Sequence, residues 1–372
     1  HLGLAGLLAT GNTLLVFASD SAWAQIIPDQ TLGHERSRVT RNVEVRGNSA
    51  DRIDGGAVRG TNLFHSFREF NVGDQQRVYF NQPAGIENIL SRVTGSDVSD
   101  IMGTLGVLGN ANLFLLNPNG IVFGPHAQLD VRGSFLATTA DRFTFPDGSE
   151  FSAIAPQPPP LLTLHITPGL QFGATPGNIA NQGHLTVGQN LTLAGNTLDL
   201  QGSLVAGNDL QVTALDTLRI RDSVDVPFIA ASGGSMLLQG NQAIDIFALN
   251  HPNSGLFSGS DMVLRSPQPI SGDAHFWSGG NFRIEQLDGQ PGIWLSLHDP
   301  IIRASGNVAF NRYTGASLHV FAGGSVNAGS ITITGTDPAD PIHETVPLSD
   351  GTSFVEVSGD RHPTVDIRAG TL

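Results

Sequence analysis

Leucines recur along the middle of the chain at an interval that few folds can produce. From His184 to Asp222, short alternating runs of apolar residues each open with a leucine, and Gly, Asn or Asp separates most runs. The leading leucines are Leu185, Leu191, Leu198, Leu204, Leu210 and Leu218. Every third leucine lies 19 or 20 residues further on, so three short strands make one repeat. Such a repeat is typical of a parallel β-helix, in which each coil lays one strand on each face.

The same period can be followed beyond this block. The anchors are Leu218, Leu237, Leu256, Phe276 and Leu295, in steps of 19, 19, 20 and 19 residues. An antiparallel sandwich or barrel also has short strands and regular turns, but it does not explain a repeat of three. Helix signals are nearly absent after residue 25, because no long segment has apolar residues at helical spacing. We therefore predict an all-β chain, a parallel β-helix with three-strand coils of 19 or 20 residues.

Composition narrows the classes of function. Among 372 residues there are 19 Lys+Arg, all of them arginine, against 33 Asp+Glu, and the formal net charge is −14. A chain this acidic, with no basic cluster, lacks the surface that neutralises phosphates, so we expect no nucleic-acid partner. The 40% of hydrophobic residues is too much for a disordered chain. The absence of cysteine excludes disulfides, thiolate metal sites and cysteine nucleophiles.

The beginning of the chain is typical of a secretory signal peptide that lacks its basic start. An apolar run over residues 1–24 ends with Ala22-Trp23-Ala24, the small residues that a cleavage site needs. A membrane-spanning helix is disfavoured, because Asp20 and the Gly11-Asn12 pair interrupt the run. We expect residues 1–24 to direct export.

Two segments interrupt the regular pattern of strands. Pro156 to Pro160 cannot pair within a sheet and predict an extended excursion. The polar, acidic segment from Gly335 to Thr352 predicts a loop that projects from a coil. The chain stops at Leu372 within another strand-like run, and no segment that would cap an open solenoid is visible there. We therefore expect the protein to continue beyond Leu372.

A tight turn is specified by the Asn-Pro-Asn-Gly tetrapeptide within the stretch from Ala111 to Gly124. Pro118 presets φ for the first corner, and the Asn117 side chain can accept a hydrogen bond from the backbone two residues on. Asn119 tolerates the second corner, and Gly120 can adopt positive φ. Apolar strands flank the tetrapeptide on both sides, so the residues alone predict a structural turn.

Three motifs in this order give the chain a family resemblance. They are HSFREFNV (His65–Val72), VYFN (Val78–Asn81) and LFLLNPNGIVFGP (Leu113–Pro125). Together, within residues 30–145, they resemble the filamentous haemagglutinin N-terminal domain, the secretion domain of two-partner (type Vb) systems, in its cyanobacterial form. The family's other short motif, usually NPNL, is missing, because residues 85–89 read GIENI.

The resemblance implies a fold and a route of export. The fold is a right-handed parallel β-helix with a capped N-terminus. The general secretory machinery moves such a protein across the inner membrane, and an outer-membrane transporter of the Omp85 type then recognises it. In this interpretation residues 25–160 form the secretion domain, and residues 161–372 continue the β-helix into an adhesin- or haemagglutinin-like passenger. Surface glycans or proteins would be the receptors of the secreted product, and no cofactor is implied.

The resemblance also implies which residues matter. The transporter-recognition or folding motif carries over to Asn117, Pro118, Asn119 and Gly120. A second family-like segment, with a capping or core role, is marked by His65, Phe67, Phe70 and Asn71.

Two other classes of function remain open. The first is a self-contained adhesin that binds glycan or matrix along its solenoid. The second is a β-helix polysaccharide lyase or hydrolase, which needs converging carboxylates, and the nearest candidates are Asp222, Asp225 and Asp245. The twelve histidines include no H-E-x-x-H motif, and no G-x-S-x-G motif occurs. We therefore expect no enzymatic activity.

Overall fold

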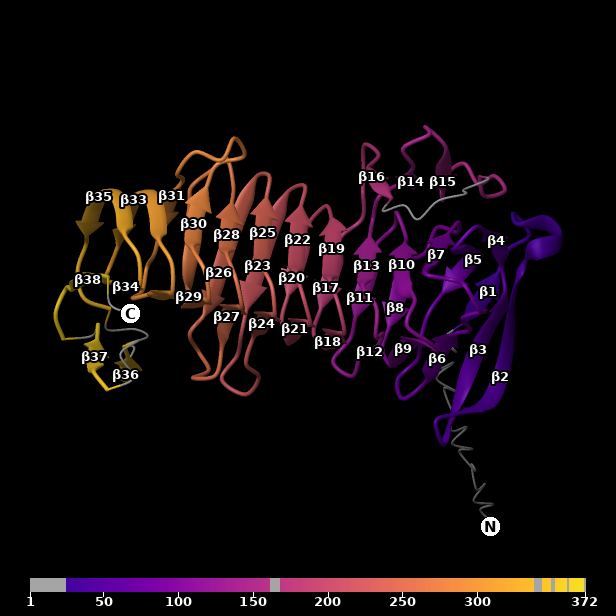
Figure 1. Cartoon of the computed structure of the whole chain (residues 1–372), viewed down its shortest axis with the longest axis horizontal. Helices are drawn as coiled ribbons and strands as arrows, with labels where there is room; N and C mark the ends of the chain where they lie inside the picture. The colour runs from indigo at the N-terminus through magenta and orange to yellow at the C-terminus, as the bar shows by residue number, and fades with distance from the viewer. Residues whose placement is uncertain (1–24, 161–167, 338–342, 349–351, 360, 371–372) are drawn as a thin grey trace, which may run out of the picture.

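The computed structural model describes residues 25–160, 168–337, 343–348, 352–359 and 361–370. This part of the chain forms three sheets, of 33, 3 and 2 strands, and its only helix is the short 3-10 turn η1 (Gly33–Glu35). The largest sheet winds into an elongated solenoid, so the predicted parallel β-helix is confirmed (Figure 1). None of the described residues forms a helix long and apolar enough to cross a bilayer. The predicted signal peptide, residues 1–24, lies outside the described residues.

Three faces run along the solenoid, and their strands pair in parallel with those of neighbouring coils. Face 1 consists of β5 (Asn62–Phe70), β7 (Asn88–Val93), β10 (Asn112–Leu116), β13 (Phe135–Thr138), β19 (Leu191–Gly195), β22 (Leu210–Ala214), β25 (Met236–Gly240), β28 (Met262–Arg265) and β30 (Phe282–Glu285). Face 2 consists of β8 (Ser99–Ile101), β11 (Ile121–Phe123), β17 (Ile179–Asn181), β20 (Leu198–Leu200), β23 (Thr217–Arg221), β26 (Ala243–Ala248) and β31 (Ile293–Leu295). Face 3 consists of β3 (Asn48–Gly55), β6 (Arg77–Phe80), β9 (Thr104–Val107), β12 (Gln128–Asp130), β18 (His184–Val187), β21 (Ser203–Ala206), β24 (Ile229–Ser232), β27 (Gly255–Ser258), β32 (Ile301–Ala304), β34 (Leu318–Ala322) and β38 (Val365–Ala369). Three longer strands turn a corner and serve two faces: β29 (Ile270–Ser278), β33 (Val308–Gly315) and β35 (Val326–Ile333).

The core is a continuous stack of inward side chains. On face 1, the stacked positions of successive coils are Leu191, Leu210, Met236, Met262 and Phe282. Each of these side chains is at most 1% exposed. Full burial of a side chain of this size contributes about 1.5–3 kcal/mol. The alternating pattern of the sequence therefore produces a core in which every coil packs on its neighbours.

The leucine repeat predicted between His184 and Asp222 is confirmed by the pairing register. The paired residues are Leu185 with Leu204, Leu191 with Leu210, and Leu198 with Leu218.

The extension of that repeat beyond Leu218 is wrong except for one step. Leu218 pairs with Ile244, 26 residues further on, and only the step from Leu256 to Phe276 is retained. The longer coils carry extra residues at the corner between faces 2 and 3, for example at residues 222–228, which separate β23 from β24. A loop at a corner changes the number of residues in a coil but leaves the stacking of its strands unchanged.

The N-terminal end of the solenoid is covered by antiparallel strands, shown in indigo in Figure 1. β2 (Ser37–Val45) pairs with β3, while β1 (Ile26–Pro28) and β4 (Ala57–Arg59) both pair with β5. Since these strands occupy the edge that another coil would otherwise use, they form the N-terminal cap that the resemblance implies.

The predicted excursion at Pro156 to Pro160 belongs to a larger insertion between coils. β14 (Arg142–Thr144) pairs with β15 (Glu150–Ser152) and with β16 (Gly169–Gln171) in an antiparallel sheet. This sheet lies beside the solenoid in Figure 1. Phe143 and Phe151 of the sheet bury their rings against face 1 of the solenoid. β13 pairs in register with β19 across the insertion, so the β-helix itself continues.

The segment from Gly335 to Thr352 is not simply a loop, and this prediction needs correction. It supplies β36 (His343–Pro347), which pairs antiparallel with β37 (Phe354–Ser358) in a two-stranded hairpin. Val346, Val355 and Val357 of the hairpin pack against Ile301 and Phe321 of face 3. Valines that alternate with polar residues give the hairpin an apolar side, and that side is buried on the solenoid.

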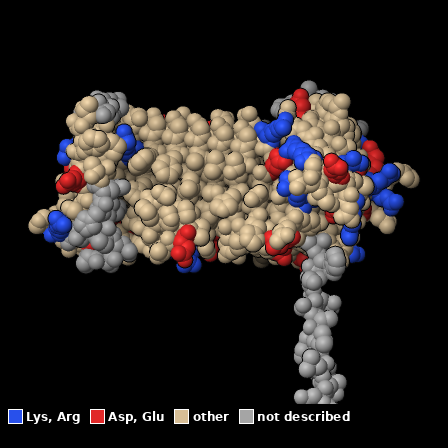
Figure 2. Space-filling model, turned by 90° about the horizontal axis from the view of Figure 1, so that it is seen from below, with Lys and Arg blue, Asp and Glu red and all other residues tan. Residues whose placement is uncertain are grey.

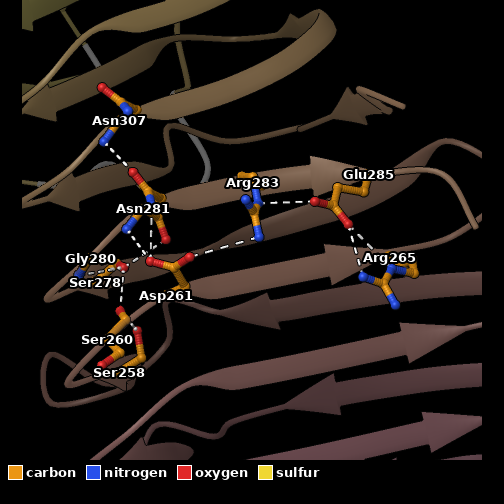
Figure 3. A network of polar contacts seen from close by, with 10 residues as sticks. All are labelled: Ser258, Ser260, Asp261, Arg265, Ser278, Gly280, Asn281, Arg283, Glu285 and Asn307. Carbon is orange, nitrogen blue, oxygen red and sulfur yellow. Dashed lines mark hydrogen bonds and ion pairs between the residues drawn. The ribbon is translucent and has the colours of Figure 1, made fainter. Parts of the chain in front are cut away.

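Corners between faces 3 and 1 are joined by polar side chains (Figure 3). Asp261 Oδ1 accepts a hydrogen bond from Asn281 Nδ2 at 3.0 Å, and Asn281 Oδ1 accepts one from the Asn307 N–H at 2.9 Å. Beside this ladder, Arg283 lies 3.8 Å from Asp261 and 3.0 Å from Glu285. Asn and Asp at corners therefore satisfy the backbone of the next coil, which is a physical reason for their frequency at these positions.

Candidate functional site

Residues Asn117 to Gly120 form the tight turn between β10 on face 1 and β11 on face 2. The Gly120 N–H donates to the Asn117 carbonyl at 3.2 Å, which closes the four-residue turn. The Asn119 N–H donates to Asn117 Oδ1 at 3.0 Å, the local hydrogen bond expected from the sequence. Pro118 lies at the first corner, where its restricted φ fits. The predicted turn is confirmed.

The side chains of this turn fasten it to the preceding coil. Asn117 is fully buried, and its Nδ2 donates to the Asp97 carbonyl at 2.9 Å and to Ser99 Oγ at 3.0 Å. Asn119 is exposed, but its Nδ2 donates to the Gly95 carbonyl at 2.8 Å. Because Gly95 and Asp97 belong to the turn between β7 and β8, two successive turns are joined.

Backbone groups connect the same turn to the following coil. The Gly177 N–H donates to the Pro118 carbonyl at 2.7 Å, and the Ile121 N–H donates to the Asn178 carbonyl at 3.0 Å. Gly120 has φ of +132°, as expected for a glycine-only corner, and a Cβ there would lie 3.1 Å from the Asn178 carbonyl oxygen. The turn is therefore held between two coils, and a side chain at position 120 would be strained by the positive φ and crowded by the Asn178 carbonyl.

The second family-like segment lies on β5 and at its end. Phe67 and Phe70 are buried, with ring centroids 5.0 Å apart, and the Phe70 ring stacks on Phe80 of face 3 at 5.8 Å. Asn71 is partly exposed, and its Oδ1 accepts a hydrogen bond from the Asp100 N–H at 2.9 Å. The phenylalanines therefore form core beneath the cap, while Asn71 joins the first coil to the next.

His65 is fully buried in the same cluster. Its Nδ1 lies 2.9 Å from Ser37 Oγ of β2, and its ring centroid lies 5.2 Å from that of Phe80. Among the described residues, Nε2 has no hydrogen-bond partner. Burial lowers the pKa of His65 to about 3, against a weaker opposing effect of the Asp54 charge. The ring is therefore neutral at physiological pH.

A buried ionic network that the sequence analysis missed lies next to this segment. Arg92 of β7 is 0% exposed and donates to Ser66 Oγ, Thr31 Oγ1 and the carbonyls of Ser152 and Gln157, at 2.8–2.9 Å. Burial lowers the pKa of Arg92 to about 10, and the negative charge of a nearby carboxylate, Asp29, partly counteracts this shift. The sequence did contain one indication of this network, because Arg92 is the only charged residue in the strand NILSRV.

Asp29 is the acidic member of this network. Burial by itself raises its pKa, but hydrogen bonds from Ser66, Thr94 and Thr31 together lower the pKa below its usual value. The chain just after β1 is thereby attached to β5 and β7. The network joins the cap, the first two coils and the inserted sheet.

The region without the NPNL motif has its own polar links. Asn88 Nδ2 donates to Asn62 Oδ1 at 3.0 Å, and Asn112 Nδ2 donates to Asn88 Oδ1 at 2.8 Å. Ile86 is buried in the main core, and Gly85 has φ of +81°. Hydrogen bonds between asparagine side chains therefore join the coils at this corner, although the sequence Asn-Pro-Asn is missing there.

The three carboxylates considered for polysaccharide cleavage do not share one site. Asp222 holds the next loop by accepting hydrogen bonds from Asn250 Nδ2, the His251 N–H and Ser254 Oγ. Asp245 forms an ion pair with Arg221, and Asp225 is exposed on its loop.

A shallow hollow of about 250 Å³ lies beside these loops, between Gln182, Gln201, Arg221 and Asp222. Asp222 is the only carboxylate among the residues that line it, whereas acid–base cleavage of a glycoside uses two. Across the described ranges, no group of three His, Asp or Glu side chains is arranged to hold a metal ion.

Comparison with known families gives one match that covers most of the chain. A model of the TPS secretion domain matches residues 24–284.

Curated relatives match over a shorter length. The heme/hemopexin-binding protein of Haemophilus influenzae (strain Rd) is 37% identical over 75 residues, which are 20% of this chain and 8% of that protein. A second Haemophilus influenzae protein of the same name is 36% identical over 75 residues, again 8% of its length. The match therefore spans less than a tenth of these curated relatives.

Two solved structures also align with the chain. The filamentous hemagglutinin secretion domain has 16% sequence identity and a TM-score of 0.37, with 83% of this chain and 99% of that chain covered. The HMW1 secretion domain from Haemophilus influenzae has 17% identity and a TM-score of 0.38, with 81% of this chain and 100% of that chain covered.

Proposed function

This chain belongs to the TPS secretion domain family, whose members are secreted exoproteins, and we propose that it targets a larger surface protein for two-partner secretion. The family match over residues 24–284 is the observation that carries the proposal. The general secretory machinery moves the chain across the inner membrane. An outer-membrane transporter of the Omp85 type then recognises the secretion domain and passes the protein to the cell surface.

Folding outside the cell begins at the N-terminal cap. β1, β2 and β4 cover one end of the solenoid, so new coils add only at the other end. Each coil pairs with the coil before it, and its core contacts come from neighbouring coils. A β-helix of this kind can fold progressively as the chain emerges from a transporter.

The Asn-Pro-Asn-Gly turn acts as a folding determinant within the secretion domain. Its buried Asn117 joins the turn to the preceding coil, and Gly120 permits its close approach to the following one. Pro118 and Asn119 are the members that a transporter can contact, because they are partly or fully exposed. His65, Phe67 and Phe70 support the same region from within the core.

The activity of the larger protein is a separate part of the proposal. We assign it an adhesin- or haemagglutinin-like passenger, with surface glycans or proteins as receptors. The names of the curated relatives refer to heme and hemopexin, but the similarity covers only 8% of those proteins and gives no reason to transfer that binding. The division between secretion domain and passenger at residue 160 stays a prediction, and the family match crosses it.

Export in a Gram-negative host tests the proposal. The chain is expressed with and without a two-partner transporter, and its amounts in the medium and the periplasm are compared by immunoblot. We expect the protein in the medium only when the transporter is present. Deletion of residues 60–125, which removes the first coils and the turn, should leave the protein in the periplasm.

An exposed loop substitution, Asp225→Ala, provides the control and should be exported normally. Equal export without any transporter would overturn the proposal and would favour a self-contained adhesin. Hydrolysis of a polysaccharide by the purified chain, lost in Asp222→Ala, would instead support the enzyme alternative.

A further inference from the structure

Face 3 carries a row of side chains that point away from the core, and those in the middle of the row are large. The row, one residue per coil in pairing register, is Ala231, Phe257, Trp277, Arg303 and Phe321. The neighbouring residues Phe276 and Ile302 are buried in the core. Because side chains alternate along a strand, the members of the row face outward.

The middle of the row is an aromatic platform with a cation on it. Phe257, Trp277 and Arg303 are all partly exposed. The rings of Phe257 and Trp277 meet edge to face with centroids 5.5 Å apart, and the Arg303 guanidinium lies 5.7 Å from the centre of the Trp277 ring. Within the described part of the chain, Arg303 makes no ion pair with a carboxylate. Its charge is therefore available to a ligand.

The charge of this face differs from that of the whole chain. The formal net charge of the chain is −14, yet Asp and Glu are absent from β21, β24, β27, β32 and β34 and from the face 3 part of β29, His275–Ser278. Asp273 of β29 lies in the part of the strand that pairs with face 2, and it is buried. Figure 2 views the molecule from below, the side on which most face 3 strands are labelled in Figure 1. In that view most charged side chains lie toward the two ends, one group of acidic and basic side chains lies at the lower edge of the middle, and the rest of the middle is uncharged. An anionic ligand would meet little repulsion there.

The two ends of the row are bounded differently. Toward the N-terminus the row continues into the small side chains Val205 and Ala231, which give a low floor. Toward the C-terminus Phe321 is only 3% exposed, because the hairpin of β36 and β37 packs on it through Val346 and Val355. The open platform is thus limited to about three coils, or roughly 10 Å between its outer strands.

We propose that Phe257, Trp277 and Arg303 bind an acidic polysaccharide. One face of a pyranose ring consists of C–H groups, and packing it on the partly exposed Trp277 ring removes apolar surface from water. The planar guanidinium of Arg303 can donate two parallel hydrogen bonds to a carboxylate or a sulfate group of the same or the next sugar. The stack on Trp277 holds Arg303 at the edge of the platform. This site is distinct from the Asn-Pro-Asn-Gly turn, which lies at the corner between faces 1 and 2.

Calorimetric titration of the purified chain tests the proposal. The probes are oligogalacturonate, which carries carboxylates, heparin oligosaccharide, which carries sulfates, and dextran, which is neutral. We expect binding to at least one acidic probe, and the one bound more tightly identifies the anionic group. Trp277→Ala should weaken this binding by at least tenfold. Arg303→Gln should reduce the affinity for the acidic probe to that for dextran.

Two exposed residues on other parts of the solenoid provide matched controls. Leu295→Ala removes an apolar side chain from face 2, and Arg312→Gln removes an exposed cation from β33, and neither should change the affinity. Thermal unfolding checks that each variant folds. The proposal is overturned if no acidic probe binds, or if a folded Trp277→Ala variant binds as tightly as the native chain. Equal binding of polyglutamate, an acidic polymer without sugar rings, would also overturn it.

Discussion

The guanidinium of Arg92 lies 4.1 Å from the centre of the Phe151 ring, and both side chains are completely buried. Arg92 belongs to the second coil, while Phe151 belongs to the sheet inserted between later coils. The same guanidinium donates to Thr31 near the beginning of the described chain. One side chain therefore joins three segments that are distant in the sequence, and it stabilises the N-terminal end of the solenoid.

Replacing Arg92 should strongly destabilise this end. Arg92→Gln removes charge-assisted hydrogen bonds from a buried site and leaves the partly buried Asp29 carboxylate without its nearby cation, which costs about 3–5 kcal/mol of unfolding free energy. Urea denaturation followed by circular dichroism measures the loss. Arg68→Gln is the control, because Arg68 is exposed and its ion pair with Glu69 has a long distance of 3.4 Å. Equal stability of the two variants would show that the network contributes nothing.

The Asn-Pro-Asn-Gly turn should respond differently to substitution of its buried asparagine and of its exposed one. Asn117→Ala leaves the buried Ser99 hydroxyl, and the carbonyl of the exposed Asp97, without their donor, and we expect a loss of about 2–3 kcal/mol of unfolding free energy. Asn119→Ala removes the bond to Gly95 from an exposed side chain, so a loss of about 1 kcal/mol is expected. Denaturant midpoints compare the two. A larger effect at Asn119 would contradict the geometry of the turn.

Any larger residue at position 120 should destabilise the protein. In Gly120→Ala the Cβ would lie 3.1 Å from the Asn178 oxygen while φ is +132°, so we expect a loss of about 1–3 kcal/mol. Thermal unfolding measures this change. Gly335→Ala is the matched control, since a Cβ there meets nothing within 4 Å and its φ is not positive. If both variants unfold at the native temperature, the turn is not constrained as described.

Stability of the cap should fall in mild acid because of His65. The pKa of His65 is about 3 in the folded protein and about 6.5 in the unfolded chain, so the unfolded state takes up the proton first. The stabilising contribution is complete above pH 6.5 and is lost progressively as the pH falls toward 3. Between pH 7.5 and pH 5 the His65 contribution to the unfolding free energy should therefore decrease by about 2 kcal/mol.

Urea unfolding at pH 7.5, 6 and 5 isolates this effect by comparison with variants. In His65→Gln the decrease should be smaller than in the native chain by the same amount, because glutamine does not titrate. His34→Gln serves as the control, since His34 is exposed in η1. The unfolding free energy of this variant should depend on pH in the same way as that of the native chain. Identical pH profiles for the His65 variant and the native chain would disprove the assignment.

Much of the fold follows from local features of the sequence. Alternating apolar residues, with Gly and Asn between the runs, predict the strands and corners, and the pairing of Leu185 with Leu204 confirms the first repeat. The Asn-Pro-Asn-Gly turn is equally local, because its two characteristic hydrogen bonds join residues within the tetrapeptide. A single sequence was sufficient for these elements because each depends on neighbours a few residues away.

Extension of the repeat failed for a physical reason. A repeat found by counting residues assumes that every coil has the same number of residues. In the structure, successive coils are matched by the side chains that stack on one another, and the number of residues between these side chains varies. The extra residues 222–228 shift the partner of Leu218 to Ile244 without disturbing the stack. The hairpin of β36 and β37 was missed in a similar way, because its valines become an apolar side only when face 3 is present to cover them.

By itself, the sequence determined that the chain is a parallel β-helix, and its motifs carried the resemblance to a secretion domain. Only the tertiary structure decided how distant side chains combine: Arg92 meets Ser152, 60 residues away, and Trp277 meets Arg303 on the next coil. The reason is that a solenoid brings together residues one coil apart, and the coil length varies with every loop. Local patterns determine the strands, whereas the path of the backbone determines which outward side chains become neighbours.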